Sequence, residues 1–254
     1  MLPRIKLILL SPIWLFRLNK LRKLAKKYRK NKLELNAQAR NNLILKYSSK
    51  ILKIYNVKVN VINPEAIPKS SSLIMANHLS NADAFILFNA LQANLESKDE
   101  PKKILTFLAK TELQRKRTIK NILSLIDTFF IDRTKIKESV KTLENFGKFV
   151  KDNKTYGVVF PEGTRSKDGN MQEFKKAPFS LAKKSLLNIL PVTINYSGDT
   201  FNSLRSKQLV VDVYIHPLIK SSTISMLSIE SLKNKTFETI ASKYIPSTPE
   251  KNKK

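Results

Sequence analysis

Apolar and polar positions along the chain predict strands separated by helices. Val57, Val59 and Val61 alternate with polar residues, which is typical of a strand with one buried face. Short apolar runs without alternation are typical of strands that are buried on both faces. The chain has such runs at 73–76, 104–109, 128–131, 156–160 and 189–196, and a further alternating strand at 209–215.

Between these strands, apolar residues recur with helical spacing. The predicted helices cover residues 33–55, 84–95, 135–152, 174–187 and 223–244. Strands that alternate with helices predict an α/β fold, with a mainly parallel central sheet and helices on both faces. The charged loop at 96–103 is predicted to be exposed, and the tail from Pro246 is predicted to be disordered.

The N-terminal residues combine an apolar run with many cations. Residues 7–16 are mostly apolar, but this run is well short of the roughly 20 residues that cross a bilayer as a helix. No small-residue cleavage site follows, so a removable signal peptide is not expected. Nine lysines and arginines then lie between Arg17 and Lys32.

This pattern favours a helical segment that lies in the membrane interface and is attracted to anionic lipid at about 1 kcal/mol per cation. The alternatives are an amphipathic helix packed on the domain and a nucleic-acid-binding arm. We therefore divide the chain into a membrane-associating segment at 1–56, an α/β domain at 57–245 and a tail at 246–254.

Composition restricts the partners and the chemistry. With 47 lysines and arginines against 20 aspartates and glutamates, the net charge of +27 favours an anionic membrane, nucleic acid, or acidic substrates and carriers. No cysteine is present, which excludes disulfides and thiolate metal sites. The two histidines, His78 and His216, are far apart in sequence, so we expect no metal site. We expect His216 to be structural or exposed.

A polar turn at 77–83 separates a predicted strand from a helix and carries the first candidate chemistry. If Asp83 begins the helix, its carboxylate can fold back onto the imidazole of His78. A carboxylate on one ring nitrogen fixes the tautomer and makes the other nitrogen a general base for a hydroxyl. Taken alone, this stretch is more typical of a solvated turn with an N-cap aspartate and an incidental histidine.

Two more polar clusters follow predicted strands. Gly163 permits close approach of the backbone to a ligand, Thr164 offers a hydroxyl, and Arg133 and Arg165 provide planar donors for phosphate. Lys110 and Lys175 are candidates for a basic rim, although each feature alone is usual on a surface. The carboxyl ends of parallel strands share one edge, so we expect the three clusters to converge.

Several common catalytic motifs are absent from the sequence. The chain has no G-x-S-x-G elbow, no G-x-x-x-x-G-K-[ST] loop, no G-x-G-x-x-G and no H-E-x-x-H. Serine hydrolases of the usual α/β type, P-loop enzymes, dinucleotide enzymes and zincin proteases therefore lose support.

Taken together, the motifs resemble those of the glycerolipid acyltransferase family, most closely the bacterial 1-acyl-sn-glycerol-3-phosphate (lysophosphatidic acid) acyltransferases. Four blocks in order carry the resemblance: Asn77-His78 through Asp83 (NHxxxxD), Phe130–Arg133, Phe160–Ser166 (FPEGTRS) and Leu190–Val192. The matching region is roughly 57–215. One departure is Asp127, where the family commonly has a glycine shortly before the second block.

The resemblance implies transfer of an acyl group from acyl-CoA or acyl carrier protein to the sn-2 hydroxyl of a lysophospholipid. His78 would be the base and Asp83 its partner. The acceptor phosphate would be held by Arg133, Glu162, Gly163, Thr164 and Arg165, with Asn77, Lys110 and Lys175 as accessory residues. We take the Gly163 amide as a hypothetical oxyanion donor.

An activated thioester needs no metal or redox cofactor, and no nucleophilic side chain. The expected location is the cytoplasmic face of a membrane, with no nucleic-acid partner. Two alternatives remain: the same chemistry on glycerol 3-phosphate or another lysophospholipid, and a non-catalytic basic protein that binds membrane or nucleic acid.

Overall fold

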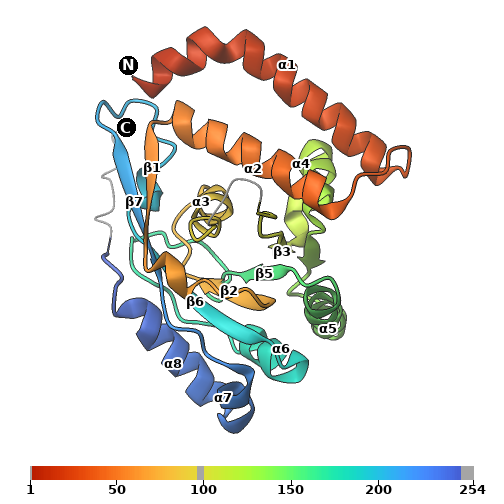
Figure 1. Ribbon diagram of the computed structural model, residues 1–254, viewed down its shortest axis with the longest axis vertical. Coiled ribbons are helices and arrows are strands. Elements are labelled where there is room, and N and C mark those ends of the chain that lie inside the picture. Colours follow the sequence, from red (N-terminus) through yellow and green to blue (C-terminus); the bar gives the residue numbers. More distant parts are fainter. Residues whose placement is uncertain (1, 96–99, 247–254) are drawn as a thin grey trace.

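A computed structural model describes residues 2–95 and 100–246 (Figure 1). The strands are β1 (Val57–Ile62), β2 (Ser72–Ala76), β3 (Leu105–Lys110), β4 (Phe129–Ile131), β5 (Tyr156–Val159), β6 (Asn188–Ile194) and β7 (Leu209–Ile215). The α-helices are α1 (Pro3–Arg29), α2 (Ala37–Ile54), α3 (Asp83–Ala90), α4 (Arg117–Leu123), α5 (Ile136–Asp152), α6 (Ala177–Ser185), α7 (Ser221–Met226) and α8 (Ile229–Ala241). Short 3₁₀ turns are η1 (Pro64–Ala66), η2 (Thr111–Arg115), η3 (Ser124–Ile126) and η4 (Ser197–Asp199).

The strands form a seven-stranded sheet in the order β1-β7-β6-β2-β5-β3-β4. Five neighbours, from β6 to β4, run parallel to one another. β7 is antiparallel to β6 and parallel to β1, so this edge pair runs in the opposite direction. The predicted α/β fold with a mainly parallel sheet is therefore confirmed.

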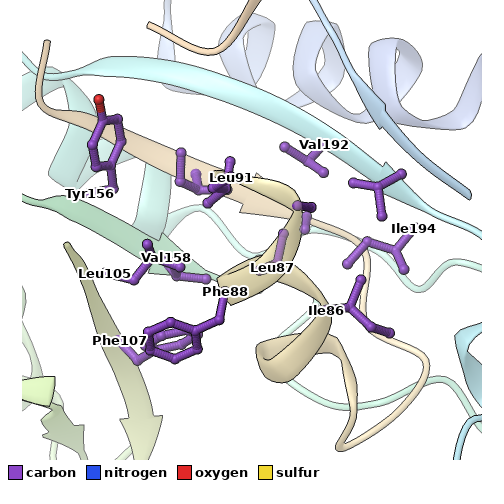
Figure 2. Close-up of a cluster of buried hydrophobic side chains, with 14 of the residues drawn as sticks. Ile86, Leu87, Phe88, Leu91, Leu105, Phe107, Tyr156, Val158, Val192 and Ile194 are labelled. Atoms are coloured by element: carbon purple, nitrogen blue, oxygen red, sulfur yellow. The ribbon is translucent and has the colours of Figure 1, made fainter. Parts of the chain in front are cut away.

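Both faces of the sheet are covered, as the unbroken apolar runs predicted. In β2, Ile74 packs in a core with α3, whereas its neighbours Leu73 and Met75 pack in a second core with α5 and α6. All three side chains are fully buried. Figure 2 shows the first core, in which the side chains of α3 lie against β5 and β6. Successive residues of a strand point to opposite faces, so one short run serves two cores.

Several regions differ from the prediction, and the helix predicted at 84–95 ends at Ala90 as α3. The closing helix at 223–244 is broken, because Ser228 caps α8 by accepting a hydrogen bond from the amide of Ser231. The helix predicted at 174–187 is shorter, because Pro178 occupies the first turn of α6, where proline is favoured. Residues 111–123 contain η2 and α4, which had no predicted element.

Another difference is in the loop at 96–103, which was predicted to be exposed. Lys103 is buried, and its Nζ donates to Oδ1 of Asn94 at 2.8 Å. Residues 96–99 lie outside the described residues, as does the predicted disorder of 247–254.

The N-terminal segment forms two helices that share the first core. Leu21 and Ala25 of α1 and Ile44 of α2 are buried in that core. α1 continues through Pro12, which has no N–H to donate to the carbonyl of Ile8; the hydroxyl of Ser11 donates to that carbonyl at 2.8 Å. The boundary at residue 57 stays a prediction.

The first half of α1 leaves a series of large apolar side chains uncovered. The exposed residues are Ile5, Ile8, Leu9, Ile13, Leu15, Phe16 and Leu18. Within the described ranges, no helix is both long enough and apolar enough to cross a membrane.

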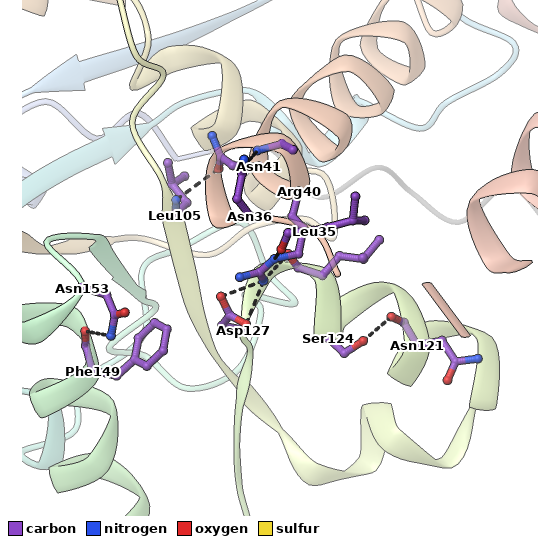
Figure 3. Close-up of polar contacts among 12 residues, drawn as sticks. Leu35, Asn36, Arg40, Asn41, Leu105, Asn121, Ser124, Asp127, Phe149 and Asn153 are labelled. Carbon is purple, nitrogen blue, oxygen red and sulfur yellow. Dashed lines mark hydrogen bonds and ion pairs between the residues drawn. The ribbon is translucent and has the colours of Figure 1, made fainter. Parts of the chain in front are cut away.

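A charged pair joins the start of α2 to the turn before β4 (Figure 3). Nη1 of Arg40 lies 2.8 Å from both carboxylate oxygens of Asp127 and donates to the carbonyl of Leu125 at 3.0 Å. Asp127 has a left-handed φ of 47°, a conformation that glycine adopts freely. The aspartate at this glycine-favouring position therefore supplies the partner of a buried arginine.

Replacing Asp127 with glycine should lower the free energy of unfolding by about 2 kcal/mol, because Arg40 keeps its charge but loses its counter-ion. Glycine fits the left-handed φ, so backbone strain does not contribute to the loss. Urea unfolding measures the difference. The control is Glu138→Gln, which removes an exposed ion pair with Lys135 and should change the value by less than about 0.5 kcal/mol. Equal effects of the two substitutions would contradict this role of Asp127.

Candidate active site

The carboxyl ends of the five parallel strands lie at one edge of the sheet. The turn after β2 carries His78, the turn after β4 carries Arg133, and the turn after β5 carries residues 160–166. The predicted convergence of the three polar clusters is confirmed by direct contacts. The amide of Ser166 donates to the carbonyl of His78 at 2.8 Å, and the guanidinium of Arg133 lies over Gly163.

His78 and Asp83 form a hydrogen-bonded pair. Nδ1 of His78 lies 2.7 Å from Oδ2 of Asp83, which is fully buried as the first residue of α3. The same oxygen accepts from the amides of Leu79 and Ser80, both at 2.9 Å. An ionised carboxylate can only accept, so toward it Nδ1 is the donor, and in the neutral ring Nε2 then keeps its lone pair.

The imidazole is held between this carboxylate and an aromatic ring. It stacks on Phe160, with ring centroids 4.0 Å apart and an interplanar angle of 14°. The side chain of His78 remains 20% exposed, in contrast to the fully buried Asp83. A substrate can therefore reach the ring while its orientation stays fixed.

Glu162 connects the first and third blocks from within the protein. Its Oε1 accepts from the amide of His78 at 2.6 Å and its Oε2 accepts from the amide of Gln172 at 2.8 Å. Burial raises the pKa of Glu162 to about 7, although these two hydrogen bonds favour the charged form. Both oxygens of Glu162 thus accept from backbone amides, so its side chain links the turn at His78 to the segment at Gln172.

The raised pKa of Glu162 makes stability depend on pH. Its ordinary pKa is 4.5, so the stabilisation linked to its proton is complete below that value and is lost as pH rises through about 7. Between about pH 5 and pH 8, the wild-type free energy of unfolding should fall by about 2 to 3 kcal/mol more than that of Glu162→Gln. Urea unfolding at several pH values tests this. Parallel pH profiles for the two proteins would contradict it.

Position 163 requires glycine for two reasons, its backbone conformation and the closeness of Arg133. Its φ is +74°, and a Cβ at this position would lie 2.6 Å from Nη2 of Arg133. Only glycine leaves room for the guanidinium to lie on this turn. The hypothesis that the Gly163 amide is the oxyanion donor is wrong, because this N–H donates to the carbonyl of Phe160 at 2.9 Å.

The remaining predicted cations and hydroxyls surround this turn. Thr164 and Arg165 are exposed and directly precede Ser166, whose amide is bonded to His78. Lys175 is exposed, and its amide donates to the carbonyl of Pro161 at 2.8 Å. Lys110 pairs in register with Ile131, two residues before Arg133. The described residues thus place four cations along or beside this sheet edge.

Asn77 and His216 have structural contacts. Asn77 is fully buried, and its side-chain amide exchanges two hydrogen bonds with the backbone of Ile194, at 2.7 and 2.9 Å. It therefore binds β2 to β6 and does not face a substrate. His216 is buried, as its structural interpretation predicted, with Nε2 2.7 Å from Oγ1 of Thr193.

Two residues near the site were not predicted. Oγ of Ser197, after β6, donates to Oδ1 of Asp83 at 2.5 Å. The hydroxyl of Tyr244 donates to the carbonyl of Gly169 at 2.5 Å, and burial, together with the nearby carboxylates of Glu162, Asp168 and Asp83, raises the pKa of Tyr244 to about 12. Ser197 follows a predicted strand, so the rule that located the other clusters could have found it. Tyr244 had no comparable signal.

The site holds an imidazole, a buried carboxylate and several cations. In the part of the chain that the structure describes, no group of three or more His, Asp or Glu side chains is placed to hold a metal ion. This arrangement is suited to removing a proton from a hydroxyl beside a bound anion.

Three of the four blocks meet at this sheet edge, and the fourth, Leu190–Val192, lies within β6. The chain belongs to the acyltransferase family, whose model matches residues 58–195. A probable 1-acyl-sn-glycerol-3-phosphate acyltransferase of Mycoplasma pneumoniae is 35% identical over 190 residues, which cover 75% of this chain and 69% of the relative. The similarly named protein of Mycoplasma genitalium is 31% identical over 207 residues, covering 78% and 75%.

A solved structure also resembles this chain. The crystal structure of the 1-acyl-sn-glycerophosphate (LPA) acyltransferase PlsC from Thermotoga maritima aligns with a TM-score of 0.69, covering 94% of this chain and 92% of that one. Sequence identity is 22%, so this likeness bears on the fold. The expected resemblance to the glycerolipid acyltransferases is confirmed, and the chain is an O-acyltransferase.

Proposed function

We propose that the chain acylates the sn-2 hydroxyl of 1-acyl-sn-glycerol 3-phosphate to form phosphatidic acid for phospholipid synthesis. The observation that carries the proposal is the His78–Asp83 pair at 2.7 Å. A backbone hydrogen bond joins His78 to the 160–166 turn, and the guanidinium of Arg133 lies against Gly163 of that turn. The names of the two Mycoplasma relatives support this choice of acceptor.

In the proposed reaction, Nε2 of His78 takes the proton of the acceptor hydroxyl as its oxygen attacks the thioester carbonyl. The new C–O bond forms, the C–S bond breaks, and the departing thiolate receives the proton from the imidazolium. Asp83 holds the ring and stabilises its positive charge during the transfer. No side chain needs to become acylated, because the thioester is already activated.

Cations at the sheet edge orient the acceptor through its phosphate. Arg133 and Arg165 are suited to bidentate contacts with phosphate oxygens, and the hydroxyl of Thr164 adds a donor. Glu162 contributes indirectly, since its two oxygens hold the amides of His78 and Gln172. Lys110 and Lys175 extend the positive field around the phosphate.

The acyl donor is acyl-CoA or acyl carrier protein, both of which are anionic and suit a chain of net charge +27. The residues described supply a base and an anion-binding turn, and the proposed chemistry asks for no metal or redox cofactor. Both donors are cytoplasmic, so we assign the enzyme to the cytoplasmic face of a membrane.

The proposed membrane contact is the exposed apolar side of α1 together with the cations that follow it. Phe16 is 71% exposed, and burying such a ring in the bilayer interface contributes about 2 kcal/mol. Phe16→Asp should therefore weaken binding to phosphatidylglycerol vesicles by at least about 10-fold in co-sedimentation. The control is Met226→Asp, which alters an exposed apolar residue on α7. Equal binding by both variants would contradict this use of α1.

A panel of acceptors tests the function. The purified full chain, with one acyl thioester, is offered 1-acyl-sn-glycerol 3-phosphate, glycerol 3-phosphate, lysophosphatidylcholine and monoacylglycerol. The proposal predicts the highest kcat/KM for 1-acyl-sn-glycerol 3-phosphate. Preference for glycerol 3-phosphate or for lysophosphatidylcholine would assign a different acceptor to the same chemistry. Transfer to none of them would refute the proposal.

A further inference from the structure

The two carboxylate oxygens of Asp83 have different partners. Oδ2 faces His78 and two backbone amides, whereas Oδ1 accepts only the hydroxyl of Ser197, at 2.5 Å, among the described residues. Ser197 is 114 residues away in the chain, and both side chains are fully buried. Without this hydroxyl, Oδ1 would be a buried charged oxygen with no donor.

The proton of the Ser197 hydroxyl is committed to Asp83. An ionised carboxylate can only accept, so the serine is the donor in this bond. The hydroxyl is also closed to solvent. These two facts exclude Ser197 as a nucleophile toward the thioester, and they leave it the task of holding the carboxylate in one rotamer.

The backbone before Ser197 holds this hydroxyl in place. Tyr196 has a left-handed φ of 66°, an uncommon conformation for a bulky residue that persists where surrounding contacts require it. Asn195 supplies those contacts: its amide donates to the carbonyl of Asp212, and its side chain bonds the backbone of Lys243 and Ile245. Ser197 is thereby anchored to β7 and to the segment after α8.

The chain after Ser197 is anchored to the end of α2 and to α3. The ring of Phe201 packs edge-on against Tyr55 at 5.1 Å and against Phe85 of α3 at 6.2 Å. Arg205 donates to the carbonyls of Tyr55 and Asn56 at the end of α2. The turn that carries Ser197 is therefore fixed on both sides. A residue that positions another side chain needs such support.

We propose that Ser197 is a positioning residue, which fixes the rotamer of Asp83 and through it the tautomer and direction of the His78 ring. This inference rests on the proposed function of the His78–Asp83 pair. Ser197, in the turn after β6, binds the carboxylate oxygen of Asp83 that His78 does not contact.

Kinetics of Ser197→Ala test the inference against a matched variant. Ser72→Ala removes another fully buried serine hydroxyl, at the start of β2, whose hydrogen bond within the described residues is to the carbonyl of Ser70. Ser197→Ala should lower kcat by roughly 10- to 100-fold with little change in either KM, because the base is misaligned. Ser72→Ala should retain wild-type kcat. Ser197→Cys keeps a weaker donor of similar size and should be intermediate.

A double substitution separates positioning from a general loss of structure. In an Asp83→Asn background, Ser197→Ala should lower kcat by less than about 3-fold, because its effect passes through the carboxylate. An equal loss in both backgrounds would overturn the proposal.

Spectroscopy gives a test that needs no substrate. The chain has two histidines, so in ¹⁵N-histidine-labelled protein the His78 ring signals are those lost in His78→Ala. Wild type and Ser72→Ala should show the Nδ1–H tautomer, and Ser197→Ala a mixture of tautomers. A single unchanged tautomer in Ser197→Ala would refute the positioning role, even if transfer to every acceptor failed and the proposed function were wrong.

Discussion

His78→Ala should lower the turnover of acyl transfer by at least about 10³-fold, because in the proposed reaction the acceptor hydroxyl then loses the group that takes its proton. The fold should persist, because the amide and carbonyl of His78 keep their bonds to Glu162 and Ser166, and Asp83 keeps the amides of Leu79 and Ser80. The measurement is phosphatidic acid formed from 1-acyl-sn-glycerol 3-phosphate and one acyl thioester by purified protein.

Two observations keep this result interpretable. The thermal unfolding midpoint of His78→Ala should stay within a few degrees of wild type, on the order of the effect of 1 kcal/mol. Vesicle binding should be unchanged, because α1 is intact. A variant that folds, binds vesicles and still turns over near the wild-type rate would remove His78 from the reaction.

Arg133→Ala should raise the KM for the phosphorylated acceptor by about 10- to 100-fold with a smaller effect on kcat, because a charge-assisted contact with phosphate is lost. Gly163→Ala should act in the same direction, since its Cβ would displace the guanidinium from the turn. Steady-state kinetics with varied acceptor measure both effects.

This prediction has two controls, a glycine substitution away from Arg133 and an acceptor without a phosphate. A Cβ at Gly198 meets no atom within 4 Å, so Gly198→Ala should keep the wild-type KM. With monoacylglycerol, which has no phosphate, the wild-type and Arg133→Ala proteins should have similar KM values. An Arg133→Ala protein with an unchanged KM for lysophosphatidate would place the phosphate elsewhere.

The sequence was sufficient to predict strands and site residues where the local pattern and the chemistry of the residues agree. Apolar runs such as 73–76 predicted strands buried on both faces, and polar turns after them predicted the sheet edge at which the turns that carry His78 and Arg133 lie. The pairing of His78 with Asp83 followed from their spacing across a turn that begins a helix. Each of these inferences uses residues that are near one another in the chain, or a general rule of parallel sheets.

The sequence was insufficient where the decisive contact joins distant segments. Glu162 belongs to a recognisable motif, but only the structure shows that its oxygens accept the amides of His78 and Gln172. The contact of Ser197 with Asp83 and that of Arg40 with Asp127 likewise join residues that no local pattern pairs. The break before α8 had a local signal in Ser228, but helical spacing on both sides of it concealed the cap.

The most direct test of the proposed mechanism is the rate of acyl transfer by Asp83→Asn at saturating lysophosphatidate and acyl donor. Asparagine keeps the size of the side chain but presents an amide where His78, Leu79 and Ser80 all donate, so the ring loses its fixed tautomer. We predict that kcat falls by about 10²- to 10⁴-fold while KM for both substrates changes little. A correctly folded Asp83→Asn protein with wild-type kcat would contradict a histidine base oriented by this carboxylate.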